Sequence, residues 1–205
     1  MGLFKGNPTL NRYRLLDSPE DLTDEFIRDR LTRNSFVDIE NTAEESSLGW
    51  VEIMSPLATG FDPAAWRFGG FLAFQARLDT RRLSAKTLNR YYLIKEAEII
   101  AQTGRKPNSH KKKEMMESLR QDLMRRSLLN TDLLEVLWFL GEREIWIGGA
   151  GEKKRLIFED LWERTFGLPV RLLVPITLGL EMLPKKSAET LFNARARFLM
   201  GDEDD

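Results

Sequence analysis

The sequence contains no cysteine and one histidine, His110. Without cysteine there can be no disulfide, no Fe–S cluster, no cysteine nucleophile and no thiolate zinc site, and a single histidine excludes a site built from three. A Ser-His-Asp triad would have to use His110, which stands beside three lysines and is expected to be exposed rather than catalytic. Composition alone therefore excludes most familiar enzyme chemistries.

Long apolar runs are absent as well. No stretch approaches the roughly 18 apolar residues that span a bilayer, and the N-terminus has no apolar signal core. Hydrophobic residues make up 42% of the 205 residues and charged residues 31%, which is typical of a folded domain. We expect a cytoplasmic protein without a membrane segment.

The net charge of −1 hides an uneven distribution. Between Arg77 and Arg126 there are 14 Lys and Arg against 6 Asp and Glu, so the remainder of the chain is acidic. Charge segregation of this kind favours a polyanionic partner, although exposed helices are often simply charged. Both interpretations stay open on composition alone.

The first third of the chain predicts strands and one helix. Ser18 can cap a helix in which Pro19 takes the first position and acids follow. Alternation places Phe71 and Ala73 on one strand face and Leu72, Phe74 and Ala76 on the other. The expected strands cover 12–16, 48–54 and 68–83, with a loop at 41–47 and irregular structure at 57–66.

The middle predicts a helical hairpin. Ser84 caps a first helix that ends near Gly104, and Ser109 begins a second helix with Met115, Met116, Leu119 and Leu123 on one stripe. This stripe suits the hairpin's own core, with a dimer contact as the alternative. Residues 111–113, all lysine, oppose the helix dipole, which indicates either a frayed helix start or a site for phosphates.

The last part returns to strands. Residues 133–140 and 144–147 flank a glycine-led turn and favour a β-hairpin, although a helix at 133–137 remains possible. A helix follows over 152–166 with Ile157, Leu161 and either Trp162 or Phe166 buried, then a strand over 170–176. A further helix is expected at 187–199, before the acidic residues 202–205.

This order predicts an α+β fold made of two similar β/α halves, β-α-β-β and β-β-α-β, with the basic helical hairpin inserted between them. The expected domains are a central α+β domain of residues 1–83 and 127–183, the hairpin of residues 84–126, and a C-terminal helix and tail of residues 184–205.

Three other patterns give weaker signals. The glycine-rich residues 148–154 lack the spacing and the Gly-Lys-Ser/Thr ending of a phosphate loop. Glu142, Glu144, Glu159 and Asp160 could serve a metal-dependent nuclease, but no spacing singles them out. Tryptophans at 138, 146 and 162 could stack on bases, although core positions are commoner for them.

Several short motifs, in order, resemble the bacterial recombination-associated RdgC family. They are Leu3-Phe4-Lys5, Arg12-Tyr13-Arg14-Leu15, Gly49-Trp50-Val51 with Met54, the Gly104-Arg105 turn between charged helices, and Leu168-Pro169-Val170 with Pro175. The chain departs from the family pattern where Glu52-Ile53 replaces paired prolines. It also ends after the part that matches the family's N-terminal portion.

The resemblance implies a ring-shaped homodimer that binds duplex DNA without sequence preference and restrains RecA-driven recombination. Members are also named exonucleases. In the family a helical lobe closes one side of the ring and C-terminal elements close the other, so ring closure in this chain stays open.

Together these lines predict a nucleoid-associated, non-catalytic, sequence-independent binder of double-stranded DNA that uses no metal or cofactor. The alternatives are a metal-dependent DNA exonuclease and a protein-interaction module. The candidate phosphate-binding residues are Arg81, Arg82, Lys86, Arg90, Arg105, Lys106, Lys111, Lys112, Lys113, Arg120, Arg125 and Arg126.

Overall fold

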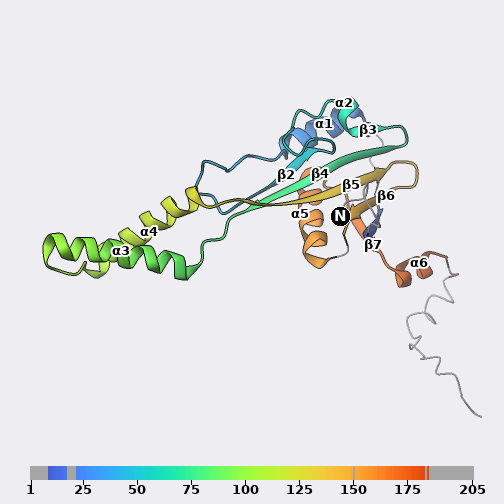
Figure 1. The fold of residues 1–205 in the computed structure, drawn as a ribbon. Coiled ribbons are helices and arrows are strands. Elements are labelled where there is room, and N and C mark those ends of the chain that lie inside the picture. The colour runs from blue at the N-terminus through green and yellow to red at the C-terminus, as the bar shows by residue number, and fades with distance from the viewer. Residues whose placement is uncertain (1–8, 18–21, 150, 183, 185–205) are drawn as a thin grey trace, which may run out of the picture.

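The computed structural model describes residues 9–17, 22–149, 151–182 and 184. The strands form one sheet, and two of the helices form an arm that projects from it (Figure 1). In chain order the elements are β1 Leu10–Leu15, α1 Asp24–Arg33, β2 Ser46–Glu52, α2 Pro63–Trp66, β3 Arg67–Phe68, β4 Phe71–Thr80, α3 Ala85–Thr103, α4 Ser109–Arg126, β5 Asn130–Phe139, β6 Glu144–Gly148, α5 Glu152–Phe166, β7 Val170–Leu173 and α6 Pro175–Met182.

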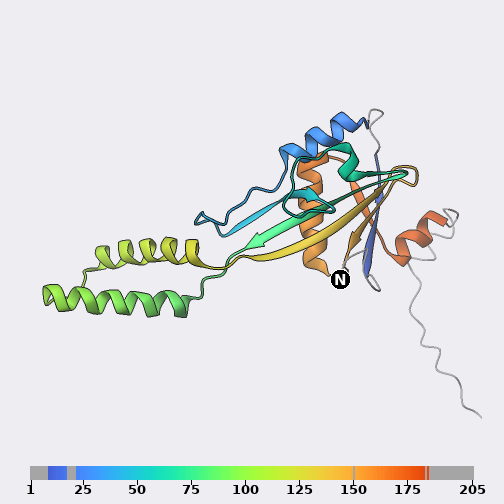
Figure 2. The ribbon, with the colours of Figure 1, turned by 45° about the horizontal axis from the view of Figure 1, so that its top comes forward.

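The sheet has seven strands in the order β2-β4-β5-β6-β1-β7, with β3 paired to β4. All pairings between these strands are antiparallel. The long strands β4 and β5 lie side by side and antiparallel. Strand β4 leads into the helical arm and β5 leads out of it, so the arm is an extension of these two strands (Figure 2). The expected α+β class is confirmed.

One face of the sheet holds the main core. Trp50, Phe74, Trp138, Trp162 and Phe166 are buried there with neighbouring ring centroids 4.5–6.4 Å apart. Each large side chain contributes about 1.5–3 kcal/mol when fully buried, so this aromatic layer dominates the stability of the sheet. Helix α5 supplies two of the five rings.

The strand alternation expected for β4 is confirmed. Leu72, Phe74 and Ala76 join the main core, while Ala73 and Phe71 lie in a smaller cluster on the opposite face.

Gly49 and Trp50 of β2 each have a specific structural role. A Cβ on Gly49 would lie 2.4 Å from the backbone nitrogen of Phe36, so only glycine lets that chain segment cross here. The backbone nitrogen of Phe36 donates to the carbonyl of Trp50. The Trp50 indole in turn donates to the hydroxyl of Thr165 at 2.7 Å, which ties β2 to α5.

The helical hairpin of α3 and α4 forms as its capping residues predict. The hydroxyl of Ser84 accepts from the backbone nitrogen of Thr87, and Gly104 ends α3 in the left-handed conformation with φ 70°. The side chain of Asn108 caps α4 by accepting from the backbone nitrogen of Lys111 at 2.8 Å. Asparagine and serine satisfy otherwise unpaired helix N–H groups in this way.

Some expected boundaries are wrong. The first helix begins at Asp24 with Thr23 as its cap, and the predicted Ser18 start lies outside the described residues. The expected strand at 68–83 is divided by a turn in which Gly69 has φ 56°, which leaves β3 and β4. Residues 57–66, expected to be irregular, contain the short helix α2.

Toward the C-terminus, the expected strand at 133–140 lies in β5, which spans Asn130–Phe139, so the helical alternative is wrong. Helix α5 buries both Trp162 and Phe166, and also Phe158, which the expected face omitted. The strand expected over 170–176 ends at Leu173, because Pro175 fits the first turn of a helix and begins α6. The helix expected at 187–199 lies outside the described residues.

Candidate nucleic-acid interface

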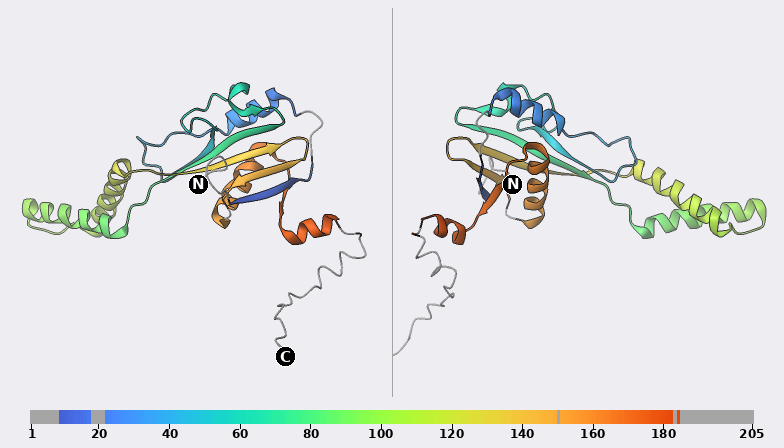
Figure 3. Two further views of the ribbon diagram at one scale, coloured as in Figure 1. Left: turned by 45° about the vertical axis from the view of Figure 1, so that its right-hand side comes forward. Right: turned by 180° about the vertical axis from the view of Figure 1, so that it is seen from behind.

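Five exposed cations gather at the free end of the helical hairpin. They are Arg105 and Lys106 in the turn and the three lysines at 111–113 in the first turn of α4, and we call them the tip cluster. Helix α3 has 19 residues, so at 1.5 Å per residue the tip lies about 28 Å from the sheet end of the arm. Figure 3 shows the arm and α6 at opposite ends of the protein.

The tip cluster has little compensating negative charge. The first turn of α4 contains no acidic residue. Lys111 Nζ lies 3.3 Å from a Glu114 oxygen, and exposed His110 lies 3.4 Å from the same carboxylate. Within the described residues, Arg105, Lys106 and Lys113 have no ion pair. The positive end of the helix dipole therefore adds to a local excess of cations.

Lys112 has a second role in the hairpin. Its Nζ lies 5.1 Å from the centre of the Tyr92 ring, and Tyr92 is buried between the helices with Met115 and Leu119. The Tyr92 hydroxyl donates to Glu96 at 2.8 Å, and this hydrogen bond, followed by burial, raises the pKa of Tyr92. The tip lysines are thus held on an ordered helix, since α4 begins at Ser109 and includes them.

A second group of cations lies where the hairpin leaves the sheet. We call Arg82, Lys86, Arg120, Arg125 and Arg126, all exposed, the neck cluster. Arg120 pairs with Glu45. A groove of about 560 Å³ opens here, lined by Glu45, Arg82, Ser84, Leu88 and Arg120 among others. Arg90, also exposed, lies on α3.

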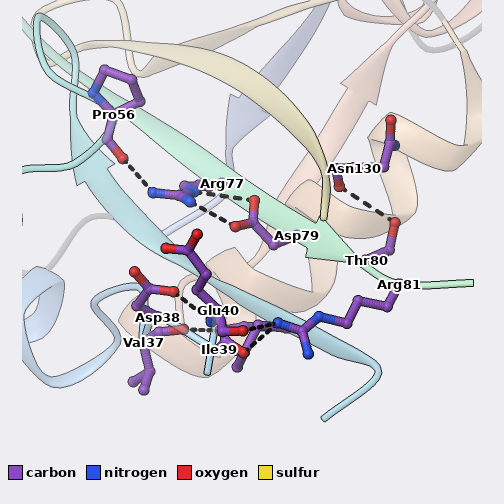
Figure 4. A network of polar contacts seen from close by, with 11 residues as sticks. Val37, Asp38, Ile39, Glu40, Pro56, Arg77, Asp79, Thr80, Arg81 and Asn130 are labelled. Atoms are coloured by element: carbon purple, nitrogen blue, oxygen red, sulfur yellow. Dashed lines mark hydrogen bonds and ion pairs between the residues drawn. The ribbon is translucent and has the colours of Figure 1, made fainter. Parts of the chain in front are cut away.

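Arg81 differs from the other predicted site residues. It is only 5% exposed, and its guanidinium donates to the backbone carbonyls of Thr42 and of Met124 (2.8 Å). It also donates to the carbonyls of Ile39 (2.7 Å) and Glu40 (Figure 4). Met124 is in the last turn of α4, so Arg81 links the hairpin to the loop that precedes β2. Its two terminal nitrogens make these contacts inside the protein, and its buried Nε has no hydrogen-bond partner among the described residues. Arg81 is therefore not part of the proposed binding surface.

Next to Arg81, Arg77 forms a buried pair with Asp79. Arg77 Nη2 lies 2.6 Å from Asp79 Oδ2, and the Asp79 side chain is fully buried (Figure 4). The hydrogen bond from Arg77 to Asp79 raises the pKa of Arg77, and the guanidinium also lies 4.2 Å from the centre of the Phe36 ring. This pair stiffens β4 immediately before the neck.

The apolar stripe expected on α4 is largely internal. Met115 and Leu119 are buried against Tyr92, and Met116 packs against them. Helix α3, by contrast, exposes Tyr91, Leu93 and Ile94 at 42%, 52% and 47%.

The four candidate nuclease carboxylates do not form a site. Glu144 accepts hydrogen bonds from Arg12 and from the Trp146 indole and pairs with Arg14 at 3.2 Å. Glu159 accepts from the Tyr13 hydroxyl at 2.7 Å, and Asp160 pairs with Arg164 at 3.1 Å.

No metal-binding group of three His, Asp or Glu side chains occurs in the described part of the chain. Glu144, Glu159 and Asp160 are already engaged with arginine and tyrosine and do not fit the divalent cation of a nuclease. The burial of Tyr13, reinforced by Glu159, raises the pKa of the Tyr13 hydroxyl.

Two of the three candidate stacking tryptophans are unavailable to bases. Trp138 and Trp162 are fully buried in the main core, whereas Trp146 is partly exposed on the opposite sheet face beside Phe139. The glycine-rich residues after β6 connect that strand to α5, and the backbone nitrogen of Gly149 donates to the carbonyl of Thr9 at 2.7 Å. These residues therefore serve as the connection between a strand and a helix.

Among the described helices, none is both long and apolar enough to cross a lipid bilayer. A search among curated proteins found no match. A family model described as "Putative exonuclease, RdgC" matches residues 8–177, which include the whole sheet and the hairpin. The chain therefore belongs to the RdgC family.

Proposed function

We propose that this protein binds double-stranded DNA through phosphate contacts made by the hairpin, without sequence preference and without catalysis. The observation that carries the proposal is the tip cluster: five exposed cations at the end of an ordered arm, three of them at a helix N-terminus. Cations at the positive end of a helix dipole suit phosphate oxygens.

The second set of contacts would come from the neck cluster. With the arm about 28 Å long, tip and neck can reach phosphates about eight base pairs apart along one strand, at 3.4 Å per base pair. Binding through separated phosphate contacts depends on backbone spacing rather than on sequence. It also releases counterions, so the affinity falls steeply with salt.

We also propose a homodimer, as the family resemblance implies. The exposed apolar side chains of α3, Tyr91, Leu93 and Ile94, support a protein contact on the arm. A dimer presents two arms to one duplex, which raises the affinity through effective concentration. Occupancy of nucleoid DNA in this way would compete with recombination proteins, RecA included, for the same duplex.

The proposal is tested by fluorescence anisotropy with two unrelated duplexes of equal length. Replacing Lys111, Lys112 and Lys113 together with Glu should abolish binding to both duplexes at moderate salt. The matched control replaces Arg28, Lys153 and Arg164 with Glu, which changes the total charge equally but outside the arm. Equal losses in both triple variants would contradict the tip as the binding site.

The same titration with Mg²⁺ tests the exonuclease alternative. The family description names that activity, but three of the four candidate carboxylates, Glu144, Glu159 and Asp160, are engaged with arginines and Tyr13. We expect the labelled duplex to stay intact with Mg²⁺ or Mn²⁺. Degradation that requires the cation and survives rigorous purification would refute the non-catalytic proposal, and absence of binding even at low salt would favour the protein-interaction module.

A further inference from the structure

Strand β5 has an unpaired edge that no part of the described chain covers. Its whole length, Asn130–Phe139, pairs with β4 on one side. On the other side β6 pairs only with residues 136–139, because β6 ends at Gly148, opposite the middle of β5. The backbone of Asn130–Leu134 therefore offers hydrogen-bond donors and acceptors along an open edge.

A pocket adjoins this edge on the sheet face that carries α5. It has a volume of about 380 Å³ and is walled by Ala76, Leu78, Leu134 and Ile157. These side chains are apolar, and the pocket is wide enough for one medium-sized aliphatic side chain.

A second pocket adjoins the same edge on the opposite face. It has a volume of about 340 Å³ and is lined by Gln75, Thr131, Gly148 and Lys154. Gln75 is 7% exposed, and its Oε1 accepts no hydrogen bond from the described residues. This pocket therefore suits a polar side chain, whereas the pocket on the α5 face suits an aliphatic one.

The paired pockets match the geometry of an added strand. Successive side chains of a strand point to opposite faces of a sheet, so one extended segment along β5 places neighbouring residues into the two pockets. A helix or a small molecule would not use both faces and the backbone edge between them. The alternation of an apolar and a polar pocket specifies a segment with alternating apolar and polar residues.

Local charge adds a preference near the start of α5. Lys154 and Asp132 line both pockets, Lys153 lines the apolar one and Glu135 lines the polar one. The cap of α5 is Gly151, which supplies no side-chain hydrogen bond, so the positive end of this helix lies at the rim as well. Lys153 has one weak partner, Asp132 at 3.5 Å, and both side chains are well exposed.

We propose that the open edge of β5 binds an extended segment of a partner protein, in which an apolar residue alternates with polar ones and an acidic residue lies beside Lys153 and Lys154. The segment joins the sheet as an extra strand next to Asn130–Leu134. This interaction uses neither the tip nor the neck cluster and is independent of DNA binding.

The test uses the full chain and a short fluorescein-labelled peptide in which valine alternates with threonine and ends in glutamate. We expect saturable binding by anisotropy, with slower hydrogen exchange in the bound state for those amides of residues 130–134 that point away from β4. The same peptide N-methylated at alternate amides should bind about tenfold more weakly or not at all. It lacks the N–H groups that would donate hydrogen bonds to the backbone of β5. This comparison needs no protein variant and so does not depend on folding.

A pair of protein variants adds a site-specific control. Ile157→Trp fills the apolar pocket and should weaken binding about tenfold. Leu156→Trp changes the neighbouring residue, which is 59% exposed and outside the pocket, and should bind as the wild type does.

Equal binding of the methylated and unmethylated peptides would overturn the proposal. So would slow exchange, in the peptide-free protein, of those amides in residues 130–134 that point away from β4, since the edge would then already be covered by this chain or by a second copy.

Discussion

At the residue scale, Arg81 is the side chain whose role the structure defines most clearly. Its guanidinium binds four carbonyls from two regions, the loop at 39–42 and the end of α4. Arg81→Ala should lower the free energy of unfolding by roughly 3 kcal/mol, since hydrogen bonds to a charged group contribute about 1.5–3 kcal/mol and several carbonyls lose their donor. Urea denaturation measures the loss.

The adjacent Arg82 supplies the control, because it is exposed and in the described residues has no ion pair. Arg82→Ala should change stability by no more than about 0.5 kcal/mol. Similar losses for both variants would mean that Arg81 does not fasten the arm to the sheet.

Glu144 gives a prediction with a defined pH window. Burial raises the pKa of Glu144, but hydrogen bonds from Trp146 and Arg12 and the charges of Arg12 and Arg14 together lower it below its ordinary value of 4.5. A lowered pKa in the folded state contributes stability above pH 4.5, which is lost as the pH falls through the folded pKa. Glu144→Gln should therefore cost roughly 1.5–3 kcal/mol at pH 7 and progressively less below pH 4.5.

Thermal or urea unfolding across pH 3–7 checks this window (about four pH values suffice). Glu142→Gln, an exposed position in the neighbouring turn, is the control and should change stability by no more than about 0.5 kcal/mol at pH 7. A destabilisation by Glu144→Gln that stays constant down to pH 3 would contradict the electrostatic role.

Gly49 permits a third residue-scale prediction. A methyl group there meets the backbone of Ser35 and Phe36 within 2.6 Å, and backbone atoms cannot rotate away as a side chain can. Gly49→Ala should cost about 3 kcal/mol or prevent folding. Gly141→Ala is the matched control, because its Cβ would meet nothing within 4 Å, and a comparable loss in that variant would refute the steric explanation.

At the element scale, the sequence predicts the parts whose signals are local. Alternation in β4, the caps of α3 and the start of α4 at Ser109 depend on neighbouring residues, and each was predicted correctly. The cap of α4, Asn108, was not predicted. The burial of Arg81 was not predictable, because its four acceptors come from segments about 40 residues away on either side. The open edge of β5 likewise depends on where β6 ends, which only the pairing register shows.

The first turn of α4 carries an element-scale prediction. Asn108→Ala removes the acceptor for the Lys111 N–H, so the turn that holds the tip lysines should fray, at a cost of about 1 kcal/mol. Hydrogen exchange should quicken at residues 109–113 and stay unchanged in α5. Unchanged exchange at the tip would show that packing against Tyr92, rather than the cap, holds this turn.

At the scale of the whole molecule, a net charge of −1 gives no general attraction to DNA. The proposed affinity must come from the placement of charge: a basic arm that projects from an otherwise acidic chain (Figure 1). This arrangement keeps the sheet away from the phosphates while the arm approaches them. It also confines the salt dependence to a small number of contacts on the arm.

The most direct test of DNA binding by the arm is the slope of log K against log salt concentration, for the wild type and for Lys111→Ala/Lys112→Ala/Lys113→Ala. Each phosphate contact contributes about −0.9 to the slope, so losing three should make it about 2.7 less steep. Arg28→Ala/Lys153→Ala/Arg164→Ala should keep the wild-type slope. Equal slopes for the tip variant and the wild type, or no binding at the lowest salt, would contradict DNA binding through the hairpin.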